Sequence, residues 1–146
     1  MLIRKMLESD VVQVHQIEKE IFSQPWSEED FYSSLKNTNN LYLVAEIHGE
    51  IVGYCGCWGI AGEGDIYNVA VKTQFRRKRI GLEMLQELIR EGQTKGLGTF
   101  TLEVRRSNLA AIRLYETLGF EQVAIRKDFY QKPNEDAVIM WWKPIQ

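Results

Sequence analysis

The spacing of hydrophobic positions changes several times along the 146-residue chain, and each change predicts a new element. Short apolar runs rich in β-branched and aromatic residues predict strands. Apolar residues three and four positions apart, as at Leu82, Leu85 and Leu88, predict helices. The predicted strands are 2–6, 41–47, 51–60, 65–71, 99–104, 120–127 and 137–142, and the predicted helices begin after residues 10, 27, 81 and 108. Ser9 and Asp10 are the candidate caps of the first helix, and Ser27 with Asp30 resembles a capping box for the second.

This order of elements, βααβββαβαββ, indicates an α+β (mixed α/β) protein. Strand–helix–strand units beside a hairpin predict a mixed sheet with helices on both faces. The chain contains no linker-like segment, internal repeat or low-complexity region, so we expect residues 1–146 to form a single domain. In sheets of this kind, ligands tend to bind at the carboxyl ends of strands where the topology opens.

The most distinctive stretch is 65–82, which reads as a strand, a basic loop and the start of a helix. Four consecutive cations, from Arg76 to Arg79, stand just before Gly81. Cations at a helix N-terminus oppose the helix dipole, and a bound anion held by the free N–H groups of the first turn would offset this. We therefore expect a phosphate or pyrophosphate site here, with a solvated run of charges as the alternative.

Three side chains after this stretch could carry chemistry. Glu103 lies near the carboxyl end of its strand, where it is either a general base or a solvated glutamate. Tyr115 lies on the apolar stripe of the next helix. It is either a core tyrosine or a phenol of pKa about 10 that could protonate a leaving thiolate, whose thiol has a pKa of about 8.5. Asn108 either only caps this helix or also reaches a ligand between the two strand–helix units.

Composition narrows the classes of partner. The formal net charge is −2 and 26% of the residues are charged, which disfavours nucleic acid or an acidic membrane surface as a partner. A nucleic-acid-binding module using the cations 76–79 is a weaker alternative, because no second basic stripe accompanies them. No apolar run approaches the length of a membrane span, and the N-terminus lacks a signal-peptide pattern. We therefore expect a cytoplasmic protein.

Cys55 and Cys57 are the only cysteines. Their spacing on a strand places both side chains on one face, which disfavours a mutual disulfide. The two histidines, His15 and His48, are remote in sequence, so a zinc site lacks ligands. We expect both cysteines to pack in the core and expect no metal.

The basic turn also resembles a known motif. Arg76-Arg77-Lys78-Arg79-Ile80-Gly81 resembles the Arg/Gln-x-x-Gly-x-Gly/Ala acetyl-CoA loop of the GNAT superfamily of N-acetyltransferases, with Arg79 where the first glycine is usual. Further motifs across nearly the whole chain resemble its RimI-type ribosomal-protein alanine N-acetyltransferases. They are Pro25-Trp26-Ser27, Asn68-Val69-Ala70-Val71, Leu102-Glu103-Val104-Arg105 with Ser107-Asn108, Leu114-Tyr115-Glu116 and Arg126-Lys127-Asp128-Phe129-Tyr130.

The resemblance implies a GNAT-like acyl-CoA N-acyltransferase fold, with a central, mixed, mostly antiparallel sheet. It implies transfer of an acetyl group from acetyl-CoA, without a metal, to the N-terminal alanine of a small-subunit ribosomal protein by a monomer. Glu103 is then the proton acceptor and Tyr115 the proton donor. The implied acetyl-CoA contacts are Val69, Ala70, Val71, Arg76, Arg77, Lys78, Arg79, Ile80, Gly81, Leu82 and Asn108. The candidate walls of the acceptor groove are Trp26, Tyr32 and Tyr130, with ordinary packing as the alternative for Tyr32.

In this mechanism, strand 65–71 splays from its neighbour, and pantetheine pairs with Val69 and Val71 like an added strand. An α-amine of pKa about 8 is roughly a quarter neutral at a pH of about 7.5, whereas a lysine is roughly 0.1% neutral. A single base therefore suits an α-amine better than a lysine. The alternatives are a GNAT enzyme acting on a protein lysine or a small-molecule amine, and a non-catalytic acyl-CoA-binding module.

Overall fold

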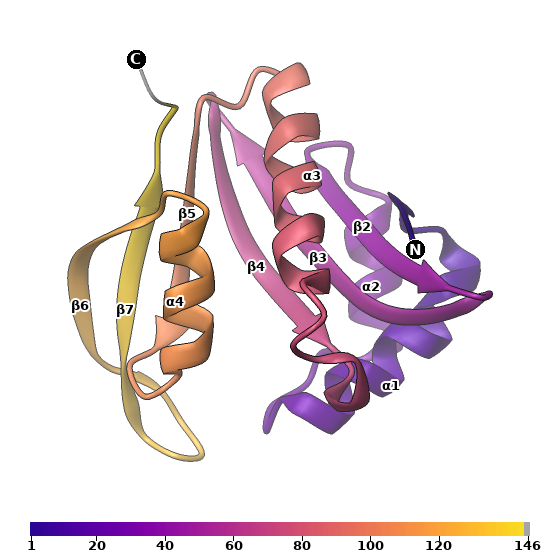
Figure 1. The fold of residues 1–146 in the computed structure, drawn as a ribbon, viewed down its shortest axis with the longest axis horizontal. Helices are drawn as coiled ribbons and strands as arrows, with labels where there is room; N and C mark the ends of the chain where they lie inside the picture. The colour runs from indigo at the N-terminus through magenta and orange to yellow at the C-terminus, as the bar shows by residue number, and fades with distance from the viewer. Residues whose placement is uncertain (145–146) are drawn as a thin grey trace.

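The computed structural model describes residues 1–144, and within them the order of elements agrees with the prediction. The strands are β1 (Leu2–Lys5), β2 (Asn40–Ile47), β3 (Glu50–Ile60), β4 (Glu63–Val71), β5 (Thr99–Arg105), β6 (Glu121–Tyr130) and β7 (Glu135–Trp142). The helices are α1 (Val11–Ile21), α2 (Glu28–Leu35), α3 (Ile80–Thr94) and α4 (Leu109–Thr117), with 3-10 turns η1 (Glu8–Asp10) and η2 (Thr73–Phe75). The strands form one sheet in the order β1-β2-β3-β4-β5-β7-β6 (Figure 1).

The sheet is antiparallel except at its centre, where β4 and β5 run parallel. These two strands pair only from Glu63 and Thr99 to Ile66 and Leu102. Beyond that point both continue without pairing, and Figure 1 shows them separating toward their carboxyl ends. The expectation that strand 65–71 splays from its neighbour is therefore confirmed.

A bulge in β4 lies where the two strands part. Gly56 of β3 pairs with Asn68, and the next residue, Cys57, pairs with Ile66, so Tyr67 has no partner in β3. An extra residue of this kind bends its strand and increases the local twist. The bulge thus helps to turn β4 away from β5.

The helices cover both faces of the sheet, as predicted. Figure 1 shows α3 and α4 on one face and α1 and α2 on the other. One hydrophobic core lies under α3 and α4, and a second lies under α1 and α2. Cys55 and Cys57 are free and buried in the first core, as expected, and burial raises the pKa of Cys57 to about 12.

Local capping signals were only partly correct. Ser27 caps α2 as predicted, since its hydroxyl accepts a hydrogen bond from Asp30 N at 3.0 Å, and Asp30 Oδ2 accepts one from Ser27 N. The prediction that Asp10 caps α1 was wrong, because its carboxylate accepts from Leu7 N and from Arg4 instead. These bonds, from residues three and six positions earlier, occupy the carboxylate in place of a cap on α1.

The two C-terminal strands are longer than predicted. β6 continues to Tyr130 and β7 begins at Glu135, where these two residues pair across the loop. The polar residues of this hairpin hide it from a hydrophobic pattern, because β6 forms the sheet edge and is exposed along almost its whole length. The connecting loop is therefore short, and its position is fixed by strand pairing.

Candidate active site

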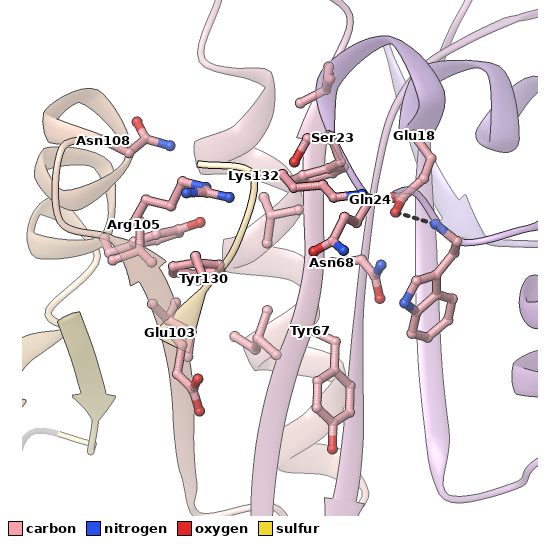
Figure 2. A pocket seen from close by; sticks show the side chains of 18 of the residues that line it. Glu18, Ser23, Gln24, Tyr67, Asn68, Glu103, Arg105, Asn108, Tyr130 and Lys132 are labelled. Atoms are coloured by element: carbon pink, nitrogen blue, oxygen red, sulfur yellow. Dashed lines mark hydrogen bonds between the residues drawn. The ribbon is translucent and has the colours of Figure 1, made fainter. Parts of the chain in front are cut away.

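A cleft of about 620 Å³ opens where β4 and β5 part (Figure 2). Its walls come from α1, the α1–α2 loop, β4, β5, α4 and the β6–β7 loop, together with Arg76 after the end of β4. Elements from both faces of the sheet therefore meet in one cavity. The predicted site residues that line it are Trp26, Val69, Arg76, Glu103, Asn108, Tyr115 and Tyr130.

Other predicted residues lie outside the walls of this cleft. Tyr32 packs against the core under α1 and α2, which fits its alternative as an ordinary packing residue. Ala70, Ile80 and Leu82 are buried, and Val71 packs against the core under α3 and α4. Side chains buried in this way leave mainly the backbone of β4 and of the turn available to a ligand.

The basic turn has an unusual backbone. Arg77 and Arg79 both have φ of 64°, in the left-handed region that favours glycine. Arg79 occupies the position before the first residue of α3, and its side chain makes no capping hydrogen bond. The conformation explains why a glycine is usual at this position, and it shows that an arginine is accommodated here with its side chain exposed.

The first turn of α3 has no side-chain cap. Helix N-terminal N–H groups without an intrahelical acceptor bind anions well. The four cations of the turn are exposed around them. The turn can therefore hold a phosphate group by backbone N–H groups, with the cations adding a favourable field.

Gly81 lets α3 lie close to α4. A β-carbon at this position would lie 3.2 Å from Leu114 Cδ2 of α4 and 3.9 Å from Val71 Cγ2 of β4. Any larger side chain would push these elements apart. The glycine therefore keeps the basic turn near α4, which carries Tyr115.

Glu103 stands on β5 one residue beyond Leu102, the last residue that pairs with β4. Its side chain is 32% exposed, and Oε1 lies 3.5 Å from Arg126 Nη1. Figure 2 shows Glu103 and Tyr67 on opposite sides of the gap between β5 and β4. Partial burial together with the carboxylates of Asp65 and Glu103 raises the pKa of Tyr67, so this phenol stays neutral.

Tyr115 approaches the cleft from the α4 side of the sheet. The residue is only 7% exposed and packs edge-on against Phe120, with ring centroids 5.9 Å apart. Burial raises the pKa of Tyr115 above its ordinary value, so its hydroxyl remains protonated and can donate a hydrogen bond. Tyr115 packs in the core, as its first alternative states, and it also lines the cleft.

Asn108 has the capping role predicted for it. Its Oδ1 accepts a hydrogen bond from Ala111 N at 3.2 Å at the start of α4. The residue also lines the cleft, and Figure 2 shows it at the α4 side of the cavity. The cap fixes the start of the helix that delivers Tyr115.

Glu18 is a residue of the cleft that the sequence did not reveal. It is 3% exposed on α1, accepts a hydrogen bond from Trp26 N at 2.9 Å and accepts another from the Tyr54 hydroxyl (Figure 2). Burial, and then the neighbouring charge of Glu18, raises the pKa of Tyr54. These bonds hold the α1–α2 loop and Trp26 against the sheet. A glutamate four residues after Val14, on the apolar face of α1, was the available signal.

Arg105 is a second missed residue, although it lies in a quoted motif. Its guanidinium donates to Pro133 O at 2.9 Å and to Gln131 O at 3.0 Å, and it stacks 4.5 Å from the centre of the Tyr130 ring. These contacts tie the β6–β7 loop to β5. Tyr130 and Lys132 of the loop line the cleft, and partial burial raises the pKa of Tyr130 to about 12.

Glu135 joins this loop to α4. Its carboxylate accepts from Ser107 N at 2.5 Å and pairs with Arg105 at 3.3 Å. The hydrogen bonds from Ser107, and then the pairing with Arg105, lower the pKa of Glu135. The β6–β7 loop and the start of α4 are therefore held by the same pair of charged residues, Glu135 and Arg105.

Two further features of residues 1–144 bear on the chemistry. This part of the chain has no cluster of His, Cys, Asp or Glu side chains that could hold a metal ion. None of its helices is both long and apolar enough to cross a membrane.

Residues 11–120 match the model of the acetyltransferase (GNAT) family, and the chain belongs to this family of acetyl-CoA-dependent acetyltransferases. The ribosomal protein bS18-alanine N-acetyltransferase of Salmonella typhimurium is 37% identical over 135 residues, 90% of each protein. Its Escherichia coli K12 counterpart is 35% identical over 136 residues, again 90% of each. The crystal structure of the ribosomal-protein-S18-alanine N-acetyltransferase from Escherichia coli matches with a TM-score of 0.89 and 33% identity, over 97% of this chain and 92% of that one.

Proposed function

We propose that this protein transfers the acetyl group of acetyl-CoA to the N-terminal α-amine of a small-subunit ribosomal protein, with alanine as the first residue. One observation carries the proposal. The same cleft is lined by Arg76 of the basic turn and by the aromatic residues Trp26 and Tyr130, and Glu103 lines it as well. The names of the relatives support the ribosomal substrate. A ribosomal substrate supports a cytoplasmic location, and we propose that residues 1–146 act there as one catalytic domain and a monomer.

The residues of the cofactor side fit acetyl-CoA. The edge of β4 that faces β5 has no strand partner beyond Ile66, so its backbone groups at Val69 and Val71 are free to pair with the amides of pantetheine. The uncapped start of α3, at residues 77–82, would hold the pyrophosphate, while Arg76 and Asn108 would contact the cofactor from opposite walls. Backbone N–H groups of β4 would also donate to the thioester oxygen, where negative charge develops.

Glu103 would accept the proton of the attacking amine, either directly or through a water molecule. Its place immediately past the last β4–β5 pair puts it at the junction between the two sides of the cleft. Arg126 pairs with it from β6 at 3.5 Å, and the Arg126 side chain is 55% exposed. No covalent enzyme intermediate is required, because the cleft can hold both reactants together.

Tyr115 would donate a hydrogen bond to the departing thiolate. A free phenol is a weaker acid than a thiol, and burial weakens Tyr115 further by raising its pKa. Its first contribution is therefore to stabilise charge on the sulfur with an intact O–H, and the proton follows as the thiol forms. The position of Tyr115 in the core, opposite the side from which the acceptor enters, suits this role.

A direct assay can test the proposal. Purified protein would be incubated with acetyl-CoA and one of three acceptors. Two are matched peptides, one with a free N-terminal alanine and one with a blocked N-terminus and an internal lysine, and the third is a small polyamine. We expect mass spectrometry to locate acetyl groups on the α-amine of the first peptide. Faster turnover of the lysine peptide or of the polyamine would contradict the proposal. Binding of CoA without any turnover would favour a non-catalytic module instead.

A further inference from the structure

Asn68 is a residue of the cleft that the mechanism above does not use. It lies on β4 two residues before Ala70, which packs in the core under α1 and α2, so its side chain points to that face of the sheet. Glu103 points to the same face, because its neighbours Leu102 and Val104 pack in the core under α3 and α4. Figure 2 shows Asn68 and Glu103 on opposite sides of the gap between β4 and β5. Asn68 is only 4% exposed, yet it lines the cleft.

A series of hydrogen bonds fixes the orientation of the Asn68 amide. Asn40 Nδ2 donates to the carbonyl and to the hydroxyl of Ser34, both at 2.9 Å, and the Ser34 hydroxyl donates to the Tyr42 hydroxyl at 3.3 Å. Tyr42 in turn donates to Asn68 Oδ1 at 3.1 Å. Burial raises the pKa of Tyr42 to about 12, so its hydroxyl keeps the proton that this last bond needs. The oxygen of the Asn68 amide is therefore the atom turned toward Tyr42.

The nitrogen of the Asn68 amide has no partner within residues 1–144. In this described part of the chain, Trp58 Nε1 is the only fully enclosed side-chain donor or acceptor without a hydrogen bond, so Asn68 Nδ2 keeps contact with the cleft that the residue lines. The buried carboxylate on this side of the cleft, Glu18, accepts from Trp26 N and from the Tyr54 hydroxyl instead. Buried polar groups in proteins are nearly always paired. Asn68 Nδ2 is therefore available to a hydrogen-bond acceptor of a ligand.

The direction of the Asn68 side chain indicates which ligand group it can reach. The cofactor contacts proposed above come from the backbone edge of β4 and the start of α3, whereas Asn68 projects toward the side bordered by Trp26. In a polypeptide N-terminus, the α-amine and the first carbonyl share one α-carbon. A donor across the gap from Glu103 can therefore hold that carbonyl while the base takes the amine proton. A lysine amine stands at the end of a four-carbon stem and brings no carbonyl to this place.

We propose that Asn68 is a substrate-binding residue that donates from Nδ2 to the carbonyl oxygen of the acceptor's first residue. The bond holds the α-amine beside Glu103 and cannot form with the amine of a lysine side chain, so it selects N-termini over lysines. Tyr42 is a positioning residue in this arrangement, because it fixes the Asn68 amide and does not line the cleft itself. The inference rests on the proposed function, because it assumes that the acceptor is a polypeptide N-terminus.

The test compares two alanine-initiated peptides that differ in one atom, an oxygen or a sulfur on the first carbonyl carbon. Sulfur is the weaker hydrogen-bond acceptor. The measurement is kcat/KM for acetylation of the α-amine, expressed per neutral amine from the titrated pKa of each peptide. We expect the oxygen peptide to be preferred by at least about threefold, the partial loss of one hydrogen bond. A third peptide, with sulfur at the second carbonyl, should react like the oxygen peptide. Equal rates for the first two would overturn the role of Asn68 and leave N-terminal acetylation in place, whereas no acetylation of any peptide would overturn both proposals.

Substitutions then assign the preference to Asn68. Asn68→Ala removes the donor, so kcat/KM for the oxygen peptide should fall about tenfold and the two peptides should react equally. Tyr42→Phe keeps the donor but releases its orientation, so it should reduce the preference for oxygen by a smaller factor. Asn39→Ala makes the matched change at an exposed residue outside the cleft and should keep the wild-type preference. A merely structural role would lower both rates alike in Asn68→Ala, and a preference for oxygen that survives in this variant would overturn the proposal.

Discussion

The two sides of the catalytic cleft are built in different ways. The proposed cofactor side comes mostly from one continuous segment, residues 65–82, in which a strand, a turn and a helix start follow one another, with Asn108 as a contact from outside it. The proposed acceptor side is assembled from the α1–α2 loop, β5 and the β6–β7 loop, which are far apart in sequence. Long-range side-chain hydrogen bonds of Glu18 and Arg105 hold it together.

This difference predicts different sensitivities to substitution. A site made of backbone N–H groups depends on chain geometry, and the arginine at the left-handed position 79 shows that its side chains can vary. A site held by individual buried or stacked side chains loses its shape when one of them changes. Substitutions on the acceptor side should therefore raise the acceptor KM, and those in the basic turn should have weaker effects.

Glu103→Gln, at the junction of the two sides, should have the largest effect. We expect kcat to fall by at least about 100-fold, because an amide cannot accept the amine proton. The loss should shrink as pH rises, since more of the amine is already neutral. Acetyl-CoA affinity, measured by calorimetry, should stay the same. Glu121→Gln on the exposed edge strand is the matched control. A wild-type kcat in Glu103→Gln would show that Glu103 does not accept the amine proton.

Tyr115→Phe should lower kcat by about 10- to 100-fold, because it removes the only O–H that this account offers to the leaving sulfur. The raised pKa of Tyr115 keeps the wild-type hydroxyl protonated, so this residue should cause no loss of rate up to about pH 10. Rates of free thiol release across this pH range would show both effects. An unchanged rate in the variant, with normal folding, would contradict the assignment.

Arg105→Lys should raise the acceptor KM about tenfold with little change in acetyl-CoA affinity. Arg105 donates to Pro133 O and Gln131 O from two different nitrogens, and a shorter lysine with one nitrogen should lose one of these bonds. Loss of one charge-assisted hydrogen bond is worth about 1.5 kcal/mol or more. Arg106→Lys is the control, since its side chain is 60% exposed and pairs with Asp136 at the rim. Steady-state kinetics with both substrates varied would separate the two constants. An equal rise in the KM for the acceptor and the KM for acetyl-CoA would show that the two sides of the cleft are not independent.

Asp10→Asn should lower the free energy of unfolding and make it depend less on pH in the acid range. Burial alone would raise the pKa of Asp10, but hydrogen bonds from Arg4 and Leu7 outweigh it and lower the pKa below 3.8. The stabilisation is therefore present above pH 3.8 and is lost as pH falls through the lower, folded-state pKa. We expect the variant to lose about 1–2 kcal/mol at pH 7, and less at low pH, in urea unfolding. A constant difference at all pH values would contradict this.

Arg79→Gly should have the smallest effect. Glycine removes the strain of a left-handed arginine but adds freedom to the unfolded chain, so stability should change by less than about 1 kcal/mol. Acetyl-CoA affinity should stay within about threefold, because the account assigns the phosphate to backbone N–H groups. Arg79→Ala, which removes the charge and keeps the left-handed requirement, is the control. A tenfold loss of affinity in both would show that the arginine side chain binds a phosphate.

The same contrast explains how much could be predicted from the sequence. The order of elements, the cap at Ser27 and the splay of β4 were predicted, because periodicity, local hydrogen bonding and the resemblance specify them. The resemblance also identified Glu103 and Tyr115, and the fold brings both to one cleft. Whether they perform the proposed chemistry is for the kinetic experiments to decide.

The missed residues have long-range roles. Glu18 finds its partner Tyr54 on a strand 36 positions away, and Arg105 reaches the loop at 131–133. A local pattern can mark such a residue, as the glutamate on the apolar face of α1 is marked, but it does not identify the distant partner. Asp10 failed as a predicted cap for a different reason, since nearby groups, Arg4 and Leu7 N, occupy its carboxylate.

The most direct test of the central claim is a crystal structure with a bisubstrate analogue in which CoA is joined to the α-amine of an alanine-initiated peptide. The account predicts pyrophosphate on the backbone of residues 77–82 and pantetheine between β4 and β5. It also predicts the peptide on the side of the sheet lined by Trp26 and Tyr130, with the joined nitrogen beside Glu103. An analogue lying wholly on one face of the sheet, or with its peptide away from Glu103, would contradict it.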